Sequence, residues 1–220
     1  MKKAVILLSG GLDSTTCLSI ALKEGYDVYP ISFDYGQRHN RELESAKKIA
    51  EHYNIKEHKI IRIGNVGGSA LTDGDIEVPD YKGTAHIPVT YVPARNIVFL
   101  SYAAGYAEVV KAEAVYIGVN DIDYSGYPDC RPEFIRAFEK VMRVGTKLGI
   151  EGKPIKIITP IMDLTKAEII KLAHQNKAPL HLTTSCYRGG ERACGTCDSC
   201  ILRLKGFKEA GISDTIDYIK

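Results

Sequence analysis

The chain has 220 residues, of which 45% are hydrophobic and 25% charged, and its formal net charge is +2 at pH 7. This length predicts one domain, or one domain with a small appendix, of ordinary globular composition. The near-neutral charge gives no reason to expect a nucleic-acid-binding surface, and the sequence holds no run of 18 apolar residues that would span a membrane. The first apolar run is too short for a secretory signal, so we expect a cytoplasmic protein.

Segments typical of strands and helices alternate along the chain. The apolar patterns predict strands over 4–8, 28–33, 59–63, 114–119 and 155–159. They predict helices over 15–23, 41–52, 94–111, 132–148 and 165–175. The alternation indicates an α/β fold with a doubly wound, parallel, five-stranded sheet, whose sites lie beyond the carboxyl ends of the strands. The long connection over 64–90 is expected to be a functional flap.

The first predicted strand passes directly into the turn Ser9-Gly10-Gly11, and Asp13 and Ser14 then open a helix. Such a turn aims backbone N–H groups and the positive end of a helix dipole at one point, where polyphosphate is the usual anion. The pattern lacks the lysine of a Walker A loop and is not G-x-G-x-x-G. Residues 9–14 resemble the SGGxDS loop of the N-type ATP pyrophosphatases. These enzymes cleave ATP between its α and β phosphates and adenylate a carboxyl or carbonyl oxygen.

Four cysteines lie within fifteen residues of the C-terminal part of the chain, at Cys186, Cys194, Cys197 and Cys200. Four thiolates with no spare ligand predict a closed, structural, tetrahedral zinc site. An iron–sulfur cluster is the alternative, and the absence of the usual ferredoxin ending favours zinc. We therefore expect an α/β domain over 1–178, followed by a zinc-binding segment with short helical pieces over 179–220.

Nearly the whole chain resembles the 7-cyano-7-deazaguanine synthase family of queuosine biosynthesis. The resemblance rests on residues 9–14, 33–39, 92–96, 118–131 and 164–166 and on the four cysteines. It implies that 7-carboxy-7-deazaguanine, ammonia and ATP give 7-cyano-7-deazaguanine through an adenylated carboxylate and an amide. Mg²⁺, Zn²⁺ and a homodimer are implied with it. Because the sequence leaves no room for a glutaminase domain, free ammonium is the expected donor.

The resemblance and the positions at strand ends also imply roles for individual residues. The ATP site is expected at Leu8, Ser9, Gly10, Gly11, Leu12, Asp13, Ser14, Thr15, Ser32, Phe33, Tyr35 and Arg38. The expected catalytic residues are Asp13, Ser14, Arg95 and Lys166. The alternatives are that Phe33 belongs to the core, that Arg38 and Lys166 are solvated first-turn residues, and that Arg95 pairs with an internal Asp.

The polar loop over 120–131 is expected to hold the deazaguanine. A carboxylate accepts both N–H donors of one guanine edge, and an aromatic face stacks on the ring. The expected substrate residues are Asn96, Asp121, Asp123, Tyr124, Tyr127, Asp129 and Arg131. Which Asp reads the base stays open, as does the role of Cys130, and the alternative is a solvated turn.

Two other functions remain open from the sequence. One is a sulfur-transfer enzyme of the same superfamily that activates a tRNA base, against which the small net charge argues weakly. The other is an ATP-binding sensor that has a structural zinc site and no catalytic activity.

Overall fold

The computed structural model describes residues 2–81, 87–120, 122 and 126–219. Within them lies one parallel sheet in the order β3-β2-β1-β4-β5. Its strands are β1 (Lys3–Leu7), β2 (Asp27–Asp34), β3 (Lys59–Arg62), β4 (Ala114–Tyr116) and β5 (Lys156–Ile158). The chain builds outward from β1 to β3 and then crosses back to β4 on the other side of β1. The predicted doubly wound α/β fold is confirmed, and the strand order reverses between β1 and β4.

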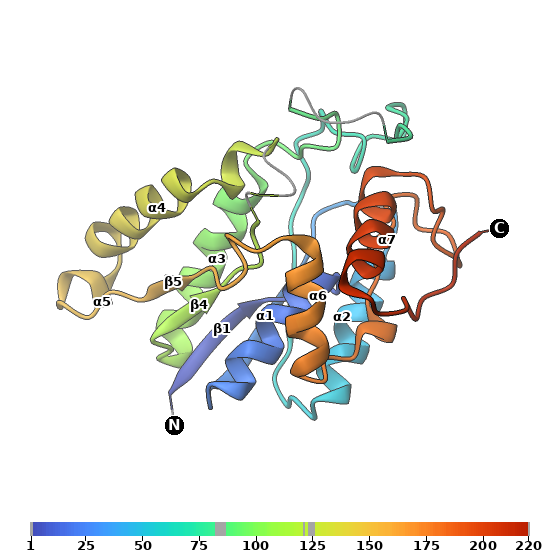
Figure 1. Ribbon diagram of the computed structural model, residues 1–220. Coiled ribbons are helices and arrows are strands. Elements are labelled where there is room, and N and C mark those ends of the chain that lie inside the picture. The colour runs from blue at the N-terminus through green and yellow to red at the C-terminus, as the bar shows by residue number, and fades with distance from the viewer. Residues whose placement is uncertain (1, 82–86, 121, 123–125, 220) are drawn as a thin grey trace.

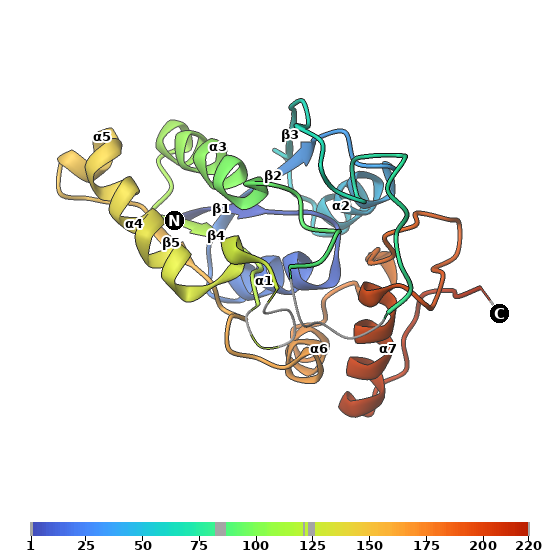
Figure 2. The same ribbon diagram turned by 90° about the horizontal axis from the view of Figure 1, so that it is seen from above.

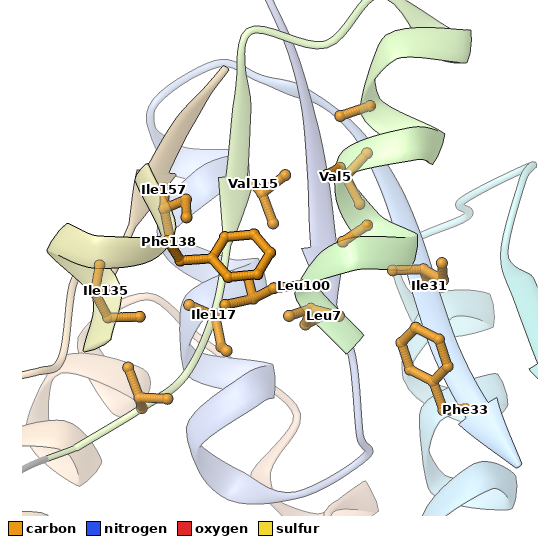
Figure 3. Packing of buried hydrophobic residues seen from close by; sticks show 14 of the residues in the cluster. Val5, Leu7, Ile31, Phe33, Leu100, Val115, Ile117, Ile135, Phe138 and Ile157 are labelled. Carbon is orange, nitrogen blue, oxygen red and sulfur yellow. The ribbon is translucent and has the colours of Figure 1, made fainter. Parts of the chain in front are cut away.

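Helices cover both faces of the sheet (Figures 1 and 2). One face carries α3 (Arg95–Val110) and α4 (Pro132–Gly145), and the other carries α1 (Leu12–Lys23), α2 (Arg41–His52) and α6 (Lys166–Gln175). Successive residues of β1 point to opposite faces, so Val5 packs toward Leu100 of α3 and Ile6 toward Leu18 of α1. Figure 3 shows the cluster of buried hydrophobic residues that contains Val5 and Leu100. Burial on both faces explains why the strand is a continuous apolar run.

The segment predicted as one helix over 132–148 is two helices, and that prediction is wrong. Helix α4 ends at Gly145, and α5 (Lys147–Ile150) follows at once. The hydroxyl of Thr146 donates to the Met142 carbonyl at 2.7 Å and accepts from the Gly149 amide at 3.0 Å. A side chain at position 149 would lie 2.3 Å from the same carbonyl, so the tight corner requires glycine.

The C-terminal segment carries more regular structure than predicted. It contains the short turn η2 (Leu180–Leu182) and the 13-residue helix α7 (Asp198–Ala210), where only short helical pieces were expected. Helices α6 and α7 lie side by side (Figure 1). A Cβ at Gly206 would come within 2.5 Å of Lys166 Cγ, so this glycine permits the close approach. Helical periodicity was hidden because glycine and cysteine interrupt the apolar pattern.

The longest helix of the described residues is α3, with 16 residues. No helix in the described part of the chain combines the length and the apolar character needed to cross a membrane.

The loop after β1 is packed on the first turns of α2. Gly10 has a φ of +88°, and a Cβ there would lie 2.1 Å from the carbonyl oxygen of Glu42 and 2.7 Å from the amide nitrogen of Ala46. Both the backbone conformation and the backbone-to-backbone contact therefore require glycine. Gly25 has a similar φ of +81°, but a Cβ there meets nothing within 4 Å.

We predict that Gly10→Ala lowers the free energy of unfolding by more than Gly25→Ala. The control carries only the left-handed strain, about 1–2 kcal/mol, whereas Gly10→Ala adds a collision with backbone that cannot rotate away. Urea unfolding followed by circular dichroism measures both variants. Equal losses in the two variants would contradict the close packing of the loop on α2.

Candidate active site

The turn between β1 and α1 is organised by its own hydroxyl groups. The Ser14 hydroxyl donates to the Gly11 carbonyl at 3.1 Å and accepts from the Ser9 amide at 3.2 Å. The Ser9 hydroxyl accepts from the Gly11 amide at 3.2 Å, and Thr15 Oγ1 donates to the Gly11 carbonyl at 2.8 Å. These bonds fix the turn at the amino end of α1, where the helix dipole favours an anion.

A cavity of about 270 Å³ lies beyond the carboxyl ends of β1, β2 and β4. It is lined by Leu8, Ser9, Gly11, Leu12, Asp13 and Ser14 of the predicted phosphate loop (residues 8–14), together with Phe33, Tyr35, Arg95, Asn96, Tyr127 and Lys166. Twelve of the predicted site residues thus converge on one cavity at the predicted edge of the sheet. This position is the usual ligand site of a doubly wound sheet.

Asp13 and Lys166 form an ion pair at the wall of this cavity. Lys166 Nζ lies 2.9 Å from both carboxylate oxygens of Asp13, and the two side chains are 16% and 31% exposed, respectively. Lys166 is the first residue of α6, whose amino end is held by a capping box between Thr165 and Glu168. A cation is disfavoured at a helix amino end, so the carboxylate offsets that cost. The pair brings together one anionic and one cationic group beside the phosphate loop.

The amino end of α3 is tied to the loop before α4. The Asn96 amide donates to Asp129 Oδ2 at 2.9 Å, and Asn96 Nδ2 donates to the Asp129 carbonyl at 3.0 Å. Asp129 is buried and does not appear among the cavity-lining residues of the described chain. Its carboxylate is thus engaged by the protein backbone. Of the expected substrate residues, Asn96 and Tyr127 line the cavity, and the Tyr127 hydroxyl is 2.8 Å from Thr90 Oγ1.

The other expected substrate residues are placed differently. Asp121, Asp123 and Tyr124 lie outside the described residues. Arg131 is exposed and precedes the first residue of α4. The role of the 120–131 loop in holding the base therefore stays a prediction.

Arg95 faces a polar group of side chains at the cavity wall. Burial opposes its charge, but Tyr35, Tyr127, Cys130 and Asp129 outweigh that effect and raise the pKa of Arg95. Its guanidinium carbon is 6.0 Å from the centre of the Tyr127 ring. A permanent cation at the buried end of an apolar helix is suited to an anionic ligand.

Several predicted ATP-site residues support the cavity from outside. Arg38 Nη2 donates to the Gly74 carbonyl at 3.1 Å and also to the carbonyls of Asp73 and Ile76, so it is bound to the connection after β3. The Ser32 hydroxyl contacts the Leu8 carbonyl at 2.5 Å and His58 Nε2 at 2.7 Å. These two residues and Gly10 and Thr15 are not among the residues that line the cavity in the described chain.

Phe33 was expected either in the ATP site or in the core, and the structure places it in both the core and the cavity wall. Its ring stacks on Phe99 of α3, with centres 4.1 Å apart and an angle of 6°, and it also lines the cavity. The side chain is therefore part of the core and of the cavity wall at once.

The C-terminal segment closes one side of the cavity, which the sequence did not indicate. Its lining residues are Thr184, Ser185, Tyr187, Ser199, Leu202 and Arg203. Arg203 is 2% exposed and donates through Nη1 to Thr183 Oγ1 at 2.8 Å and Ser185 Oγ at 3.1 Å. Its Nε and Nη2 lie 2.7 and 2.9 Å from the two carboxylate oxygens of Asp214. Its position three residues after Cys200 was the available signal.

Glu42 is a further cavity-lining residue that the sequence reasoning missed. It lies in the first turn of α2, three residues after the Gln37-Arg38-His39 stretch that carried part of the family resemblance. That proximity was a signal, but a glutamate in a helix's first turn has the ordinary explanation of favouring the helix dipole.

The four cysteines converge as predicted. Their sulfur atoms all lie within 4.8 Å of one another, and the Cys194 and Cys200 sulfurs are 3.8 Å apart. A tetrahedron of sulfurs at the usual zinc distance of about 2.3 Å has edges of about 3.8 Å. Backbone amides of Thr196 and Cys197 donate to the Cys194 sulfur at 3.4 and 3.3 Å. Against burial, these bonds lower the pKa of the Cys194 thiol, which favours the ligating form.

The connection after β3 covers this cysteine cluster. The Tyr81 amide donates to the Thr196 carbonyl at 3.1 Å, and Arg188 Nη2 lies 2.8 Å from Asp80 Oδ1. Ala70 and Val78 belong to the same buried cluster as the cysteines. The described part of the predicted flap is therefore anchored to the C-terminal segment.

The residues and their arrangement match one family of known proteins. A family model described as "Queuosine biosynthesis protein QueC" matches residues 3–211. A protein of Acetivibrio thermocellus named 7-cyano-7-deazaguanine synthase is 74% identical over 220 residues, covering 100% of this chain and 99% of that protein. One of the same name from Coxiella burnetii (strain RSA 331 / Henzerling II) is 57% identical over 223 residues, covering 100% and 99%, respectively. The chain belongs to this family.

A solved structure shows the same fold. A 4-thiouridine synthetase, described as a complex with RNA and bound ATP, superposes with a TM-score of 0.54 at 19% identity. The match covers 96% of this chain and 50% of the other. At this identity the likeness concerns the fold alone.

These comparisons confirm the predicted family and the predicted class of activity. The protein is an enzyme of the 7-cyano-7-deazaguanine synthase family and acts in queuosine biosynthesis. Neither the sulfur-transfer alternative nor the non-catalytic sensor is favoured.

The buried pair of Arg203 and Asp214 generates a stability prediction. Arg203→Met leaves an uncompensated buried carboxylate and should lower the free energy of unfolding by about 3–5 kcal/mol. Lys205→Met is the matched control, because Lys205 is on the same helix and makes only an exposed pair with Glu209 at 3.8 Å. Urea unfolding measures both, and similar small changes in the two variants would contradict the role of the buried pair.

This loss should also depend on pH. Burial opposes the charge of Asp214, but the hydrogen bonds from Arg203 prevail and lower the pKa of the carboxyl below its ordinary value. The pair therefore contributes its full stability above the unfolded pKa of roughly 3.9 and loses it as the pH falls toward the lower folded value. The difference between wild type and Arg203→Met should shrink in that acid range.

Proposed function

We propose that this cavity binds ATP and 7-carboxy-7-deazaguanine and converts the acid, with ammonia, to 7-cyano-7-deazaguanine. The observation that carries the proposal is the Asp13–Lys166 pair beside the hydroxyl-rich turn at the amino end of α1. A carboxylate resists attack by ammonia because its oxygen is a poor leaving group. Adenylation turns that oxygen into part of AMP, and ammonia then displaces AMP to give the amide. A second activation removes the amide oxygen and leaves the nitrile.

The residues that line the cavity suit the negative charges of the phosphates and of the substrate carboxylate. Backbone N–H groups of the turn and Lys166 would hold the phosphates, where negative charge develops on the departing pyrophosphate. Asp13, with the nearby hydroxyls of Ser9 and Ser14, offers the oxygen ligands that Mg²⁺ prefers. When bound, Mg²⁺ would neutralise phosphate charge there. Arg95 would face the carboxylate or α-phosphate from the opposite wall.

The deazaguanine would lie toward Tyr127 and the 120–131 loop, and the nucleoside of ATP toward Phe33 at the end of β2. An acidic residue of that loop would read the donor edge of the base. Since Asp129 is engaged by the amide of Asn96, Asp121 or Asp123 is the better candidate for that contact.

The cysteine segment would hold a structural Zn²⁺, for which the sulfur spacing fits a closed tetrahedron. Because Arg203 and Ser185 of the same segment line the cavity, the ion would support the active-site wall without taking part in the reaction. We propose a small C-terminal unit over 179–220 in this role.

We further propose a homodimer in the cytoplasm, where free thiols stay reduced. Helix α3 supports the dimer, since Ile97, Tyr102 and Val109 on its outer side are 45%, 46% and 76% exposed. An apolar face of this kind is typical of a subunit interface. Light scattering measures the mass of the particle in solution and tests this proposal.

The proposed function predicts a specific requirement for Asp13. Asp13→Ala should lower turnover by about 100- to 1000-fold, with the fold retained. Mass spectrometry of AMP and nitrile, formed from ATP, ammonium and 7-carboxy-7-deazaguanine, measures the rate. Asp34→Ala is the control, because Asp34 ends β2 and pairs with exposed Arg62 at 3.1 Å outside the cavity. Wild-type turnover in folded Asp13→Ala, or no nitrile from wild type, would contradict the proposal.

The proposed zinc site predicts one Zn²⁺ per chain and a loss of thermal stability in Cys194→Ser, because a structural metal contributes folding energy directly. Elemental analysis and thermal unfolding measure the two effects. Cys17→Ala is the control, since Cys17 is buried among the residues of α1 and lies outside the cysteine cluster. The control is expected to lose stability but keep its zinc. Iron with sulfide, or active protein without metal, would contradict the zinc assignment.

A further inference from the structure

The proposed reaction needs a proton acceptor, a role that has not yet been assigned to a residue. At neutral pH the nitrogen donor is present mainly as ammonium, which has no lone pair with which to attack carbon. One proton must leave before the C–N bond forms, and a positioned base in the site accelerates such transfers. The following inference rests on the proposed function, because it concerns how the same cavity handles this nitrogen.

Few residues of the cavity wall can accept a proton from ammonium. Among the described residues that line the cavity, the carboxylates are Asp13 and Glu42. Asp13 pairs with Lys166 at 2.9 Å in the free protein and would bind Mg²⁺ in the proposed complex, so its carboxylate is engaged in both states. Burial raises the pKa of both Tyr35 and Cys130 to about 12, so these groups stay neutral and are poor proton acceptors near pH 7.

Glu42 is held beside the reacting phosphates by the packing of two backbones. Its carbonyl oxygen would be 2.1 Å from a Cβ at Gly10, so the first turn of α2 is in direct contact with the phosphate loop. The side chain lines the same cavity as Ser9 and Asp13. A cation bound at its carboxylate would therefore lie near the carboxyl carbon whose oxygen is adenylated.

Several elements bring charged and titratable residues to the cavity wall near Glu42. Tyr35 and Arg38 follow β2, His39 precedes α2, Arg95 comes from α3, and Tyr187 comes from the C-terminal segment. Burial raises the pKa of Glu42, and His39 and Arg95 oppose that effect without cancelling it. The group is thus a stronger proton acceptor than an ordinary glutamate, while its position at a helix amino end favours the ionised form before ammonium binds.

We propose that Glu42 binds the ammonium ion and takes one of its protons, so that neutral ammonia is released next to the adenylated substrate. The balance is simple. The N–H bond breaks, its electron pair stays on nitrogen, and the proton passes to a carboxylate oxygen of Glu42. The nitrogen pair then forms the C–N bond, and the C–O bond to AMP breaks with its electrons on the departing oxygen. A second nitrogen proton passes to water, which leaves the neutral amide.

Glu42→Gln tests this role, since it keeps the shape of the side chain and removes its basicity. Three rates separate the steps: exchange of pyrophosphate into ATP with 7-carboxy-7-deazaguanine, turnover with ammonium, and hydroxamate formation with hydroxylamine. Hydroxylamine is already neutral at pH 7. We expect the exchange and the hydroxamate rate to persist, while ammonium-dependent turnover falls about 100-fold or more. The remaining ammonium rate should rise with pH in proportion to free ammonia.

Glu44→Gln is the matched control, because Glu44 is an exposed glutamate in the same first turn. It should keep all three rates. Glu42→Asp keeps a carboxylate and should recover part of the ammonium turnover, and it replaces Glu42→Gln in the assay if that variant does not fold. Unchanged ammonium turnover in folded Glu42→Gln would overturn the inference, as would a common loss of all three rates. Absence of acid-dependent exchange in the wild type would instead refute the proposed function.

Discussion

The loop after β1 and the start of α1 are packed between α2 and the loop after β4, and the active-site cavity depends on these two contacts. On one side, Gly10 lies against the carbonyl of Glu42 in α2. On the other, a Cβ at Gly118 would be 3.1 Å from the backbone of Asp13 and Ser14. Because these backbones are in direct contact, they cannot shift independently. The loop after β1, the loop after β4 and the first turn of α2 therefore form one rigid unit at this edge of the sheet. An anion site of this kind needs such preorganisation, because its N–H groups must already point at the ligand.

The charged side chains at this edge of the sheet are partly or fully buried, and each has a charged or polar partner that stabilises it. Lys166 and Asp13 neutralise each other in the free protein and are each suited to a component of the metal–nucleotide substrate. Arg95 stays charged among tyrosines and polar groups. Arg203 is more deeply buried, and Asp214 balances it. Unpaired charges in this environment would cost several kcal/mol each, so these networks specify one arrangement of the cavity wall.

The cysteine segment acts on the cavity through packing. Helix α7 begins directly after Cys197, lies against α6 at Gly206, and carries Arg203 into the cavity wall. The connection after β3 covers the same cysteines from the other side. A metal that fixes the cysteines would therefore help to hold Lys166 of α6 and the Arg203 network in position.

The sequence by itself determined the five-stranded parallel fold, the hydroxyl-rich turn after the first strand, the converging cysteines and the family, because each depends on a local pattern of a few residues. Glycines and hydroxyls after an apolar strand, and closely spaced cysteines, leave few alternatives. It did not reveal the length of α7, the break before Thr146, or the engagement of Asp129 and Arg38 by backbone groups.

Tertiary structure alone showed that Glu42 and Arg203 join the predicted residues at the cavity. Glu42 and Arg203 lie far apart in sequence, and each has an ordinary local explanation as a charge in a helix. Only the strand order places the amino ends of α1, α2 and α6 at one edge of the sheet, and only the packing of α7 on α6 adds Arg203. The physical reason is that a side chain's partners and its burial arise from contacts between distant segments, which local periodicity does not encode.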